Sequence, residues 1–254
     1  MKVRLDKLIL QRGLVSSRER AQALVLAGRV LVNEQKIEKS GASVDDEAVI
    51  RILGDDMPFV SRGGLKLARA IEHWHIDVCN QVCMDIGAST GGFTDCLLQH
   101  GAAQVIAVDT GYGQIDIRLR SDPRVRLLEK TNARYLTPEQ IWPNAALRRP
   151  IGLIAMDVSF ISATLVLPAV MQCACASAGS AGVELVVLVK PQFEVGRERV
   201  GKGGIVRDAE AHEMAVRTVS AMVAELGGEG IEVIESPILG VEGNREFLLH
   251  ARFP

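Results

Sequence analysis

The sequence has little of what marks a secreted, disulfide-bonded or zinc-binding protein. Its five cysteines are an odd number, they form no CxxC pair, and no histidine stands at zinc-ligand spacing. A disulfide framework and a structural metal are therefore not supported. The first residues alternate charged with aliphatic side chains and contain no apolar signal core, so nothing in them directs export. We expect a protein of the reducing cytoplasm that holds no metal.

The sequence also lacks an overall basic charge. Its formal net charge is -2 at pH 7, so contact with a nucleic acid must come from a local patch. Residues 1–36 supply such a patch, because they hold eight basic and only three acidic groups. A charge segregated in this way favours a surface that contacts RNA phosphates. A merely solvated face is the alternative that charge alone leaves open.

No long apolar run makes a convincing membrane span. Residues 158–183 carry no charge, and their length approaches the roughly 20 residues that cross a bilayer. Serines, a threonine and Pro168 dilute this stretch, however, and a β-branched run follows at residues 185–189. We therefore predict a buried crossover helix of an α/β sheet and no membrane contact.

The sequence begins with what reads as a small α+β module. Apolar residues at helical spacing predict two short helices, around Leu5–Ile9 and Ala21–Val25. Short strands are predicted at residues 30–32 and 49–52. The order of residues from Arg4-Leu-Asp to Val30-x-Val-Asn33 resembles the S4 RNA-binding module. The resemblance implies that the module positions structured RNA, and it makes Arg4, Arg18, Arg20 and Arg29 our candidate RNA contacts. We add Arg62, which lies just before the larger domain.

The boundary of this module is predicted from composition. Two carboxylates and a proline, in Asp55-Asp-Met-Pro58, follow the last short strand and are typical of a linker. We predict an RNA-binding domain over residues 1–54, a linker over 55–62 and a larger domain over 63–254.

A strand, a glycine loop and a helix open the larger domain. Val82–Ile86 reads as a buried strand, residues 87–92 form a loop of small residues, and residues 93–100 have helical composition. A dinucleotide, a nucleoside triphosphate and S-adenosylmethionine compete for such a loop. A loop that binds a nucleoside triphosphate ends in Lys-Ser or Lys-Thr, and this loop does not, which argues against a triphosphate. Asp85, two residues before Gly87, would disfavour a pyrophosphate but suit the ammonium group of S-adenosylmethionine.

Two further strand ends carry residues suited to the rest of this cofactor. Asp109 follows the strand at 105–108, where an acidic residue can accept from a ribose diol. Asn132 and Ala133 follow an apolar segment and could hold an adenine. Each of these residues alone could be a cap or a turn former, but an open α/β sheet binds its ligand where successive strands end. The expected cofactor-binding residues are Asp85, Gly87, Ser89, Gly91, Gly92, Phe93, Asp109, Asn132 and Ala133.

Charged residues flank the remaining predicted strands. Asp157 follows the strand at 151–156, Lys190 follows the strand at 185–189, and Glu246 precedes the strand at 247–250. A lysine directly after an aliphatic strand lies at the carboxyl edge of a sheet, where ligands bind.

At this point the sequence resembles the TlyA (haemolysin A) family over nearly its whole length. The resemblance implies a Rossmann-like methyltransferase sheet, mostly parallel with an antiparallel last strand, joined to the S4 module. It also implies S-adenosylmethionine-dependent 2′-O-methylation of cytidine in ribosomal RNA or a ribosomal subunit. The family's catalytic tetrad falls on Lys66, Asp157, Lys190 and Glu246. The motifs that carry the resemblance are Val60–Lys66, Asp85–Thr94, Met156–Ile161, Val189–Glu194, Gly201–Arg207 and Ser236–Phe247.

The chemistry constrains what Lys190 can do. Orienting a ribose against an activated methyl group can lower the activation barrier by roughly 7 to 11 kcal/mol. Lys190 could act as a base only when neutral, and burial lowers a lysine pKa by up to roughly 3 to 5 units. Asp157 and Glu246 favour the charged form instead. We therefore expect Lys190 to hold and acidify the 2′-hydroxyl, with the proton passing to a neighbour or to water.

The motif at Asp157-Val-Ser-Phe160 helps to choose the methyl acceptor. Enzymes that methylate exocyclic base amines place two prolines here to clamp a flipped base, and both are absent. None of the cysteines is placed for attack on a pyrimidine ring carbon. A ribose oxygen therefore remains as the expected methyl acceptor. The short N-terminus favours the large ribosomal subunit as the substrate. A cytolysin and an inactive RNA-binding assembly factor are the alternatives; the sequence does not determine the oligomeric state.

Overall fold

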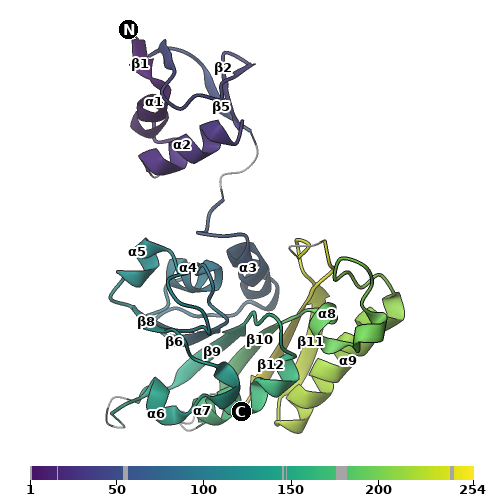
Figure 1. Cartoon of the computed structure of the whole chain (residues 1–254). Coiled ribbons are helices and arrows are strands. Elements are labelled where there is room, and N and C mark those ends of the chain that lie inside the picture. The colour runs from purple at the N-terminus through teal and green to yellow at the C-terminus, as the bar shows by residue number, and fades with distance from the viewer. Residues whose placement is uncertain are drawn as a thin grey trace. The chain divides into compact units, whose positions relative to one another are not determined.

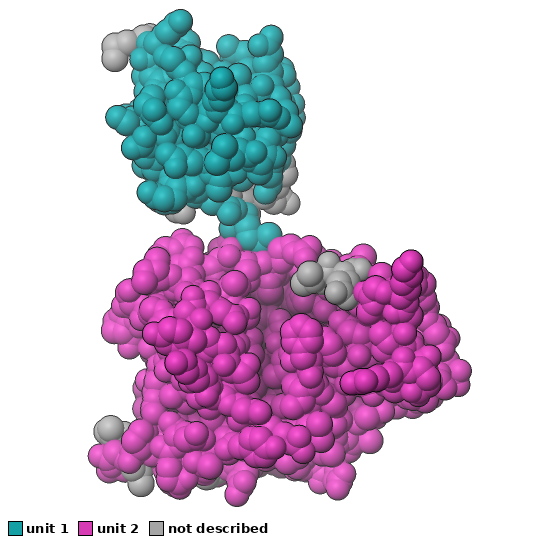
Figure 2. All heavy atoms as spheres, in the orientation of Figure 1, with its two compact units in different colours: residues 1–57 teal, residues 58–254 magenta. Residues whose placement is uncertain are grey.

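The chain folds into two compact units. The computed structural model describes residues 2–15, 17–53, 57–144, 146, 148–175, 182–240 and 243–254. The first unit comprises Met1–Met57 and the second Pro58–Pro254, as Figure 2 shows in teal and magenta. The units therefore divide inside the segment predicted as a linker.

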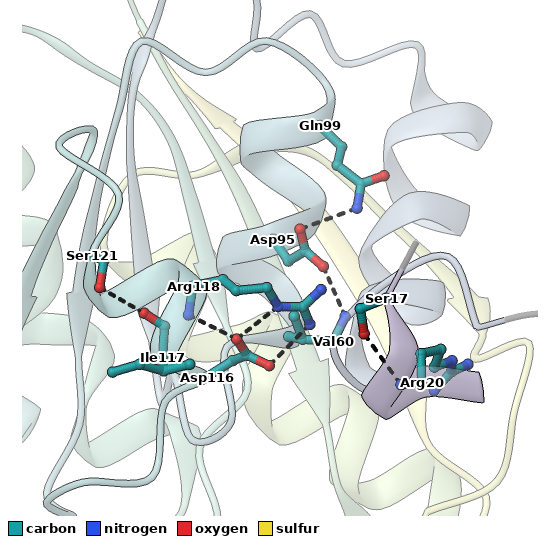
Figure 3. A network of polar contacts seen from close by, with 9 residues as sticks. All are labelled: Ser17, Arg20, Val60, Asp95, Gln99, Asp116, Ile117, Arg118 and Ser121. Atoms are coloured by element: carbon teal, nitrogen blue, oxygen red, sulfur yellow. Dashed lines mark hydrogen bonds and ion pairs between the residues drawn. The ribbon is translucent and has the colours of Figure 1, made fainter. Parts of the chain in front are cut away.

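The first unit packs two helices against short strands (Figure 1). Its core is formed by apolar side chains such as Leu5, Ile9, Leu24 and Val30. Ser17 begins the second helix, because its Oγ accepts a hydrogen bond from the backbone N–H of Arg20 at 3.1 Å (Figure 3). The elements are β1 (Lys2–Arg4) paired with β4 (Ser43–Asp45), a three-stranded sheet of β3 (Gln35–Lys36), β2 (Val30–Val32) and β5 (Ile50–Ile52), and helices α1 (Leu5–Gln11) and α2 (Arg18–Leu26).

The second unit is built on a seven-stranded sheet in the order β11-β12-β10-β9-β6-β7-β8. β12 runs antiparallel to both β10 and β11, while the other adjacent pairs are parallel. This confirms the predicted mostly parallel sheet with an antiparallel last strand. The strands are β6 (Val82–Ile86), β7 (Gln104–Val108), β8 (Val125–Leu128), β9 (Ile151–Met156), β10 (Val183–Val189), β11 (Glu229–Glu235) and β12 (Phe247–Phe253).

Helices cover both faces of this sheet (Figure 1). One apolar cluster joins the sheet to α3, α4 and α5, and a second joins its other face to α6, α7 and α9. The sheet is therefore buried on both sides, as its nearly continuous apolar strands require. The helices are α3 (Gly63–Trp74), α4 (Gly92–Gln99), α5 (Ile117–Arg120), α6 (Pro138–Ile141), α7 (Leu167–Cys175), α8 (Pro191–Glu194) and α9 (Ala209–Glu225), with short 3-10 turns at Ala133–Tyr135, Ala163–Leu165 and Arg197–Arg199.

The uncharged stretch predicted as a crossover helix contains α7, a short helix buried against the sheet. Pro168 lies in its first turn, where a missing N–H is tolerated. No helix among the described residues is long and apolar enough to span a membrane.

The beginning of the second unit is tied to α4. Asp95 accepts a hydrogen bond from the backbone N–H of Val60 at 2.7 Å and another from Gln99 Nε2 at 3.0 Å (Figure 3). These contacts fix residues just before α3, and α3 carries Lys66. Residues 58–62, which were predicted as linker, thus belong to the second unit.

Candidate active site

Asp157, Lys190 and Glu246 lie at the same edge and on the same face of the sheet. Side chains alternate between the two faces along a strand, and Leu188 of β10 packs into the cluster with α3 and α4. Lys190, two positions further, is directed to that face. Val189 is the register partner of Phe247, so Glu246 is the next residue opposite Lys190. The strands therefore place these charges on the face of the sheet that α3 and α4 cover.

The four residues of the predicted tetrad form two ion pairs. Lys66 Nζ lies 2.6 Å from Glu246 Oε2, and Lys190 Nζ lies 2.7 Å from Asp157 Oδ1. Both lysines are only 8% exposed and Glu246 is 3% exposed. Buried charges of this kind are tolerated when they are paired.

The Lys190 ammonium keeps donor capacity in this arrangement. It donates a hydrogen bond to Ser159 Oγ at 2.6 Å. Its contact with Asp157 Oδ1 is an ion pair without hydrogen-bond geometry, since that oxygen has no hydrogen-bond partner among the described residues. An ammonium group has three N–H donors, so Lys190 can hold a further acceptor such as a hydroxyl oxygen.

Closely packed glycines place Lys66. A Cβ on Gly92 would come within 2.4 Å of Ser61 Oγ and 2.9 Å of the Gly64 nitrogen, and a Cβ on Gly64 would overlap Phe59. The bare backbones let the first turns of α3 and α4 approach each other, and Lys66 follows on α3. The glycines of the Ser61-Arg-Gly-Gly64 motif are thus explained by the close packing of α3 against α4.

A pocket of about 260 Å³ opens beside these ion pairs, at the carboxyl ends of β6, β7 and β9. Six predicted residues line it: Gly87, Ser89, Asp109, Asn132, Ala133 and Asp157. Two of the remaining lining residues, Thr110 and Val158, directly follow a predicted site residue. The lining residues that were not predicted are Val108, Thr110, Gln114, Thr131, Val158, Ser159, Phe160, Ile161 and Val166.

Asp109 and Asn132 are both held by backbone contacts. Asp109 accepts hydrogen bonds from the backbone N–H groups of Ser89 at 2.7 Å and Gly111 at 2.6 Å. Its carboxylate oxygens have further lone pairs for a hydroxyl donor. Asn132 Oδ1 accepts from the backbone N–H of Arg134 at 3.0 Å and caps a 3-10 turn. Asn132 therefore combines the turn role considered for it with a place on the pocket wall.

Asp85 differs from Asp109 because it lies beneath the loop and does not line the pocket. Its side chain is fully buried on the α4 side, where Oδ2 accepts a hydrogen bond from Thr94 Oγ1 at 2.6 Å. Oδ1 is buried without a partner among the described residues. Burial raises the pKa of Asp85 to about 7. A positively charged donor reaching Oδ1 would satisfy this oxygen.

The other predicted loop residues pack the loop. Gly87 has φ +93°, and a Cβ there would lie 2.5 Å from the carbonyl oxygen of Asp157. Gly91 has φ +95°, and its Cβ would meet Leu119. Gly92 and Phe93 begin α4 and face the core. Gly91, Gly92 and Phe93 are absent from the lining of the pocket, so they shape the loop from behind.

Most arginines proposed to contact RNA make contacts within the chain. Arg4 and Arg18 both bind the buried carboxylate of Asp6, at 2.9 and 3.0 Å. Arg29 Nε donates to the carbonyl oxygen of Leu53 at 2.7 Å. Arg20, at the start of α2, also has an interaction of its own. Arg62 is exposed at the start of α3.

The residues in and beneath the pocket suit a ligand that combines a methionine group with a nucleoside. The carboxylate of Asp109 faces the pocket, the glycine loop allows close approach, and the orphaned oxygen of Asp85 lies beneath the loop. No group of three His, Cys, Asp or Glu side chains among the described residues is arranged to hold a metal ion.

Comparison with known families matches both units. The model of the FtsJ-like methyltransferase family matches residues 59–253, and the model of the S4 domain matches residues 3–50.

Individual proteins resemble the chain over most of its length. The 16S/23S rRNA (cytidine-2'-O)-methyltransferase TlyA of Mycobacterium tuberculosis is 43% identical over 99% of this chain and 90% of its own. The 23S rRNA (cytidine-2'-O)-methyltransferase TlyA of Campylobacter jejuni is 34% identical over 76% of this chain and 70% of its own. A solved structure from Streptococcus thermophilus, named as a hemolysin, is 41% identical with a TM-score of 0.73, covering 99% of this chain and 88% of its own.

Proposed function

We propose that this chain, which belongs to the FtsJ-like methyltransferase family, transfers a methyl group from S-adenosylmethionine to the 2′-hydroxyl of a cytidine ribose in ribosomal RNA. The predicted relationship to the TlyA family is confirmed by the identity to TlyA relatives over nearly the whole chain. The cytidine and the ribosomal RNA are named for those relatives, and we extend them to this chain. The S4 unit then supplies RNA binding, in the cytoplasm where ribosomes are assembled.

The observation that carries this proposal is the pairing of Lys190 with Asp157 and of Lys66 with Glu246 at the carboxyl edge of the sheet. The pairs combine two buried ammonium groups with two carboxylates beside a pocket that suits a nucleoside. Such a site orients a hydroxyl and stabilises a developing oxyanion. It offers neither a cysteine nucleophile nor a proline clamp for base methylation.

Residues of the pocket, together with Asp85 beneath it, would hold the cofactor. Asp109 would accept from its ribose diol, Asn132 and Ala133 would lie against its adenine, and Asp85 would neutralise its ammonium group beneath the glycine loop. When bound, S-adenosylmethionine supplies an electrophilic methyl group on sulfur. The side chains of the protein would then position the acceptor oxygen and assist the loss of its proton.

Lys190 would position that oxygen. Its ammonium is held by Asp157 and Ser159, and its remaining donor capacity can be directed at the 2′-oxygen. A cation hydrogen-bonded to this oxygen favours loss of the hydroxyl proton to a neighbouring carboxylate or to water. A pH titration of the cofactor-bound enzyme in which Lys190 proved neutral would contradict this role.

Phe160 would receive the base of the target nucleotide. Its ring is 91% exposed, although it belongs to the pocket wall. The residue adopts φ +64°, a strained conformation for a bulky side chain. Its ring centroid lies 5.4 Å from that of Phe193. An exposed aromatic face held beside a ribose site can stack on an unstacked base.

The test offers purified full-length protein and labelled S-adenosylmethionine to separated ribosomal subunits and to naked ribosomal RNA. Label should enter RNA at a cytidine 2′-oxygen, and comparison of the subunits tests our expectation of the large one. Lys190→Ala should abolish transfer. Arg124→Ala is the matched control, because Arg124 precedes β8 at the opposite edge of the sheet and pairs with Asp122 at 2.7 Å.

Three outcomes would count against the proposal. Absence of transfer to every RNA substrate would leave an inactive RNA-binding protein, and label on a base would move the acceptor away from ribose. Lysis of red cells by the purified protein, undiminished in Lys190→Ala, would favour a cytolysin.

A further inference from the structure

The segment between α8 and α9 carries three exposed cations that form no ion pair among the described residues. They are Arg197, Lys202 and Arg207. Arg199 differs, since it contacts Asp208 and Glu210 at the start of α9. Residues 196–207 thus contain four cations and one carboxylate, that of Glu198.

This segment has a defined backbone. The Gly201 nitrogen donates to the carbonyl oxygen of Ile205 at 3.0 Å, and the Gly204 nitrogen donates to that of Gly201 at 3.1 Å. Gly203 and Gly204 have φ of +78° and +75°, a conformation that glycine adopts at little cost. The result is a tight turn that places Lys202 in solvent near its tip.

A buried asparagine holds this turn. Asn244 is 1% exposed. Its Oδ1 accepts from the backbone N–H of Val206 at 2.9 Å, and its Nδ2 donates to the carbonyl oxygen of Gly204 at 2.9 Å. His212 Nε2 lies 2.9 Å from the carbonyl oxygen of Val206. Both sides of the turn are thus tied to residues buried next to the sheet.

The same asparagine belongs to the loop that supports Glu246. The carbonyl oxygen of Asn244 accepts from the Gly240 nitrogen at 2.8 Å. Gly240 lies so close to the Glu246 carboxylate that a Cβ would stand 2.4 Å from Oε1. Asn244 is also only two residues before Glu246. The position of the charged turn is therefore coupled to the position of the Lys66–Glu246 ion pair.

We propose that Arg197, Lys202 and Arg207 form a surface that binds RNA backbone phosphates flanking the target ribose, and that Asn244 is the positioning residue that fixes this surface to the active site. The inference rests on the proposed function. Exposed cations on a defined turn, unpaired among the described residues, suit a polyanion. Because the turn is anchored beside Glu246, the phosphates it binds lie next to the reacting nucleotide.

The surface is tested with Lys202→Gln/Arg207→Gln, whose positions are exposed, so the fold should persist. The KM for RNA should rise several-fold, and the slope of log affinity against log salt should fall by about one for each phosphate that the variant no longer neutralises. The affinity for S-adenosylmethionine should not change. Arg124→Gln, at the opposite edge of the sheet, is the control for removal of a positive charge.

Failure of this inference is distinguishable from failure of the proposed function. A wild-type protein that methylates RNA, with an unchanged KM and salt slope in the double variant, would refute the phosphate surface alone. A wild-type protein that methylates no RNA would refute the proposed function. Preferential binding of the wild type to an acidic protein or to anionic vesicles, with RNA binding unaffected by the substitutions, would also refute the phosphate surface.

The positioning role of Asn244 is tested with Asn244→Ala and Asn244→Asp. Loss of its hydrogen bonds should loosen the backbone of the turn, so that trypsin cleaves faster after Lys202 and Arg207, and it should raise the KM for RNA. Cofactor affinity and the melting temperature report that the domain remains folded. Asn244→Asp keeps the acceptor for Val206 but places a buried carboxylate oxygen against the carbonyl oxygen of Gly204, so it should release the turn at least as much as Asn244→Ala. Unchanged trypsin protection and an unchanged KM in Asn244→Ala would show that the turn needs no such anchor.

Discussion

At the scale of single residues, Asp6 and Asp85 show how surroundings give one side chain two opposite properties. Both carboxylates are fully buried. The hydrogen bonds from Arg4, supported by those of Gln22 and Arg18, hold the pKa of Asp6 well below its usual range. Burial raises the pKa of Asp85 to about 7, because the hydrogen bonds from Thr94 compensate it only in part. Asp6 therefore acts as a permanent charge, whereas Asp85 can titrate near neutral pH.

Asp6 is predicted to organise the RNA-binding face of the first unit. Asp6→Asn removes the charge that holds Arg4 and Arg18, and should destabilise this unit by about 2 kcal/mol, the typical contribution of hydrogen bonds to a charged group. RNA affinity should fall as the arginines lose their orientation. Chemical denaturation and RNA titration measure the two effects. Glu38→Gln is the control, because Glu38 makes an exposed ion pair with Lys36.

The stability due to Asp6 should also depend on pH in a definite direction. Its folded-state pKa lies below the unfolded value of 3.8, so the stabilisation is fully present above that value and is lost as pH falls through the lowered pKa. An acid titration in which wild type and Asp6→Asn lose stability in parallel would contradict this prediction.

Asp85 is predicted to couple cofactor binding to proton release. Its pKa of about 7 means that the carboxyl group is largely protonated at pH 6. An ammonium group binds the carboxylate, so cofactor binding at pH 6 should release a proton, and affinity should rise with pH until it levels off above pH 7. Calorimetry in buffers of different ionisation enthalpy measures how many protons are released on cofactor binding. Asp85→Asn should show no such release, and equal release in both proteins would refute the assignment.

At the scale of secondary structure elements, Gly87 joins the cofactor loop to the end of β9. Gly87→Ala combines a positive φ with a Cβ 2.5 Å from the Asp157 carbonyl oxygen. We expect a loss of stability of about 1 to 3 kcal/mol from the backbone alone, and a fall in kcat because Asp157 must move.

Gly113→Ala separates these two effects. Gly113 also has a positive φ of +72°, but nothing lies within 4 Å of its Cβ position. The Gly113→Ala variant should be less stable than the wild type, but its folded fraction should keep full activity. Melting temperature and methyl transfer are the measurements. Equal losses of activity in the two variants would mean that the contact between Gly87 and Asp157 is unimportant.

The ends of the strands show where local pattern was insufficient. The sequence predicted strands at 185–189 and 247–250, whereas β10 begins at Val183 and β12 continues to Phe253. The apolar pattern is interrupted by Glu184 and Arg252. These two residues are register partners whose side chains form an ion pair at 2.9 Å. A charged pair across adjacent strands can extend a sheet, but neither residue alone signals this.

At the scale of the whole molecule, the two units have separate cores. We therefore predict that residues 58–254 fold without the first unit and bind S-adenosylmethionine as tightly as the full chain. Methyl transfer by this fragment should need a much higher RNA concentration, because the S4 unit supplies the additional RNA contact. Calorimetry and steady-state kinetics test this. A fragment with the KM of the full chain would show that the first unit does not contribute to RNA binding.

The sequence by itself determined the order of elements, the chemistry at the strand ends and the basic N-terminal unit. These features are local, since an apolar strand and the residue after it can be recognised without knowledge of neighbouring strands. The residues Asp157, Lys190 and Glu246 were recognised in this way, and Lys66 only by resemblance.

The tertiary structure alone decided where each of these side chains points and which of them meet. Lys66 and Glu246 are 180 residues apart and pair because α3 covers the face to which β12 directs its glutamate. Asp85, expected at the pocket, faces the same side of the sheet as Asp157 but lies beneath the glycine loop, where Thr94 of α4 contacts it. Asn244 holds a turn some 40 residues away. Strand phase, register and long-range packing set these contacts, and none of the three can be read from a single segment.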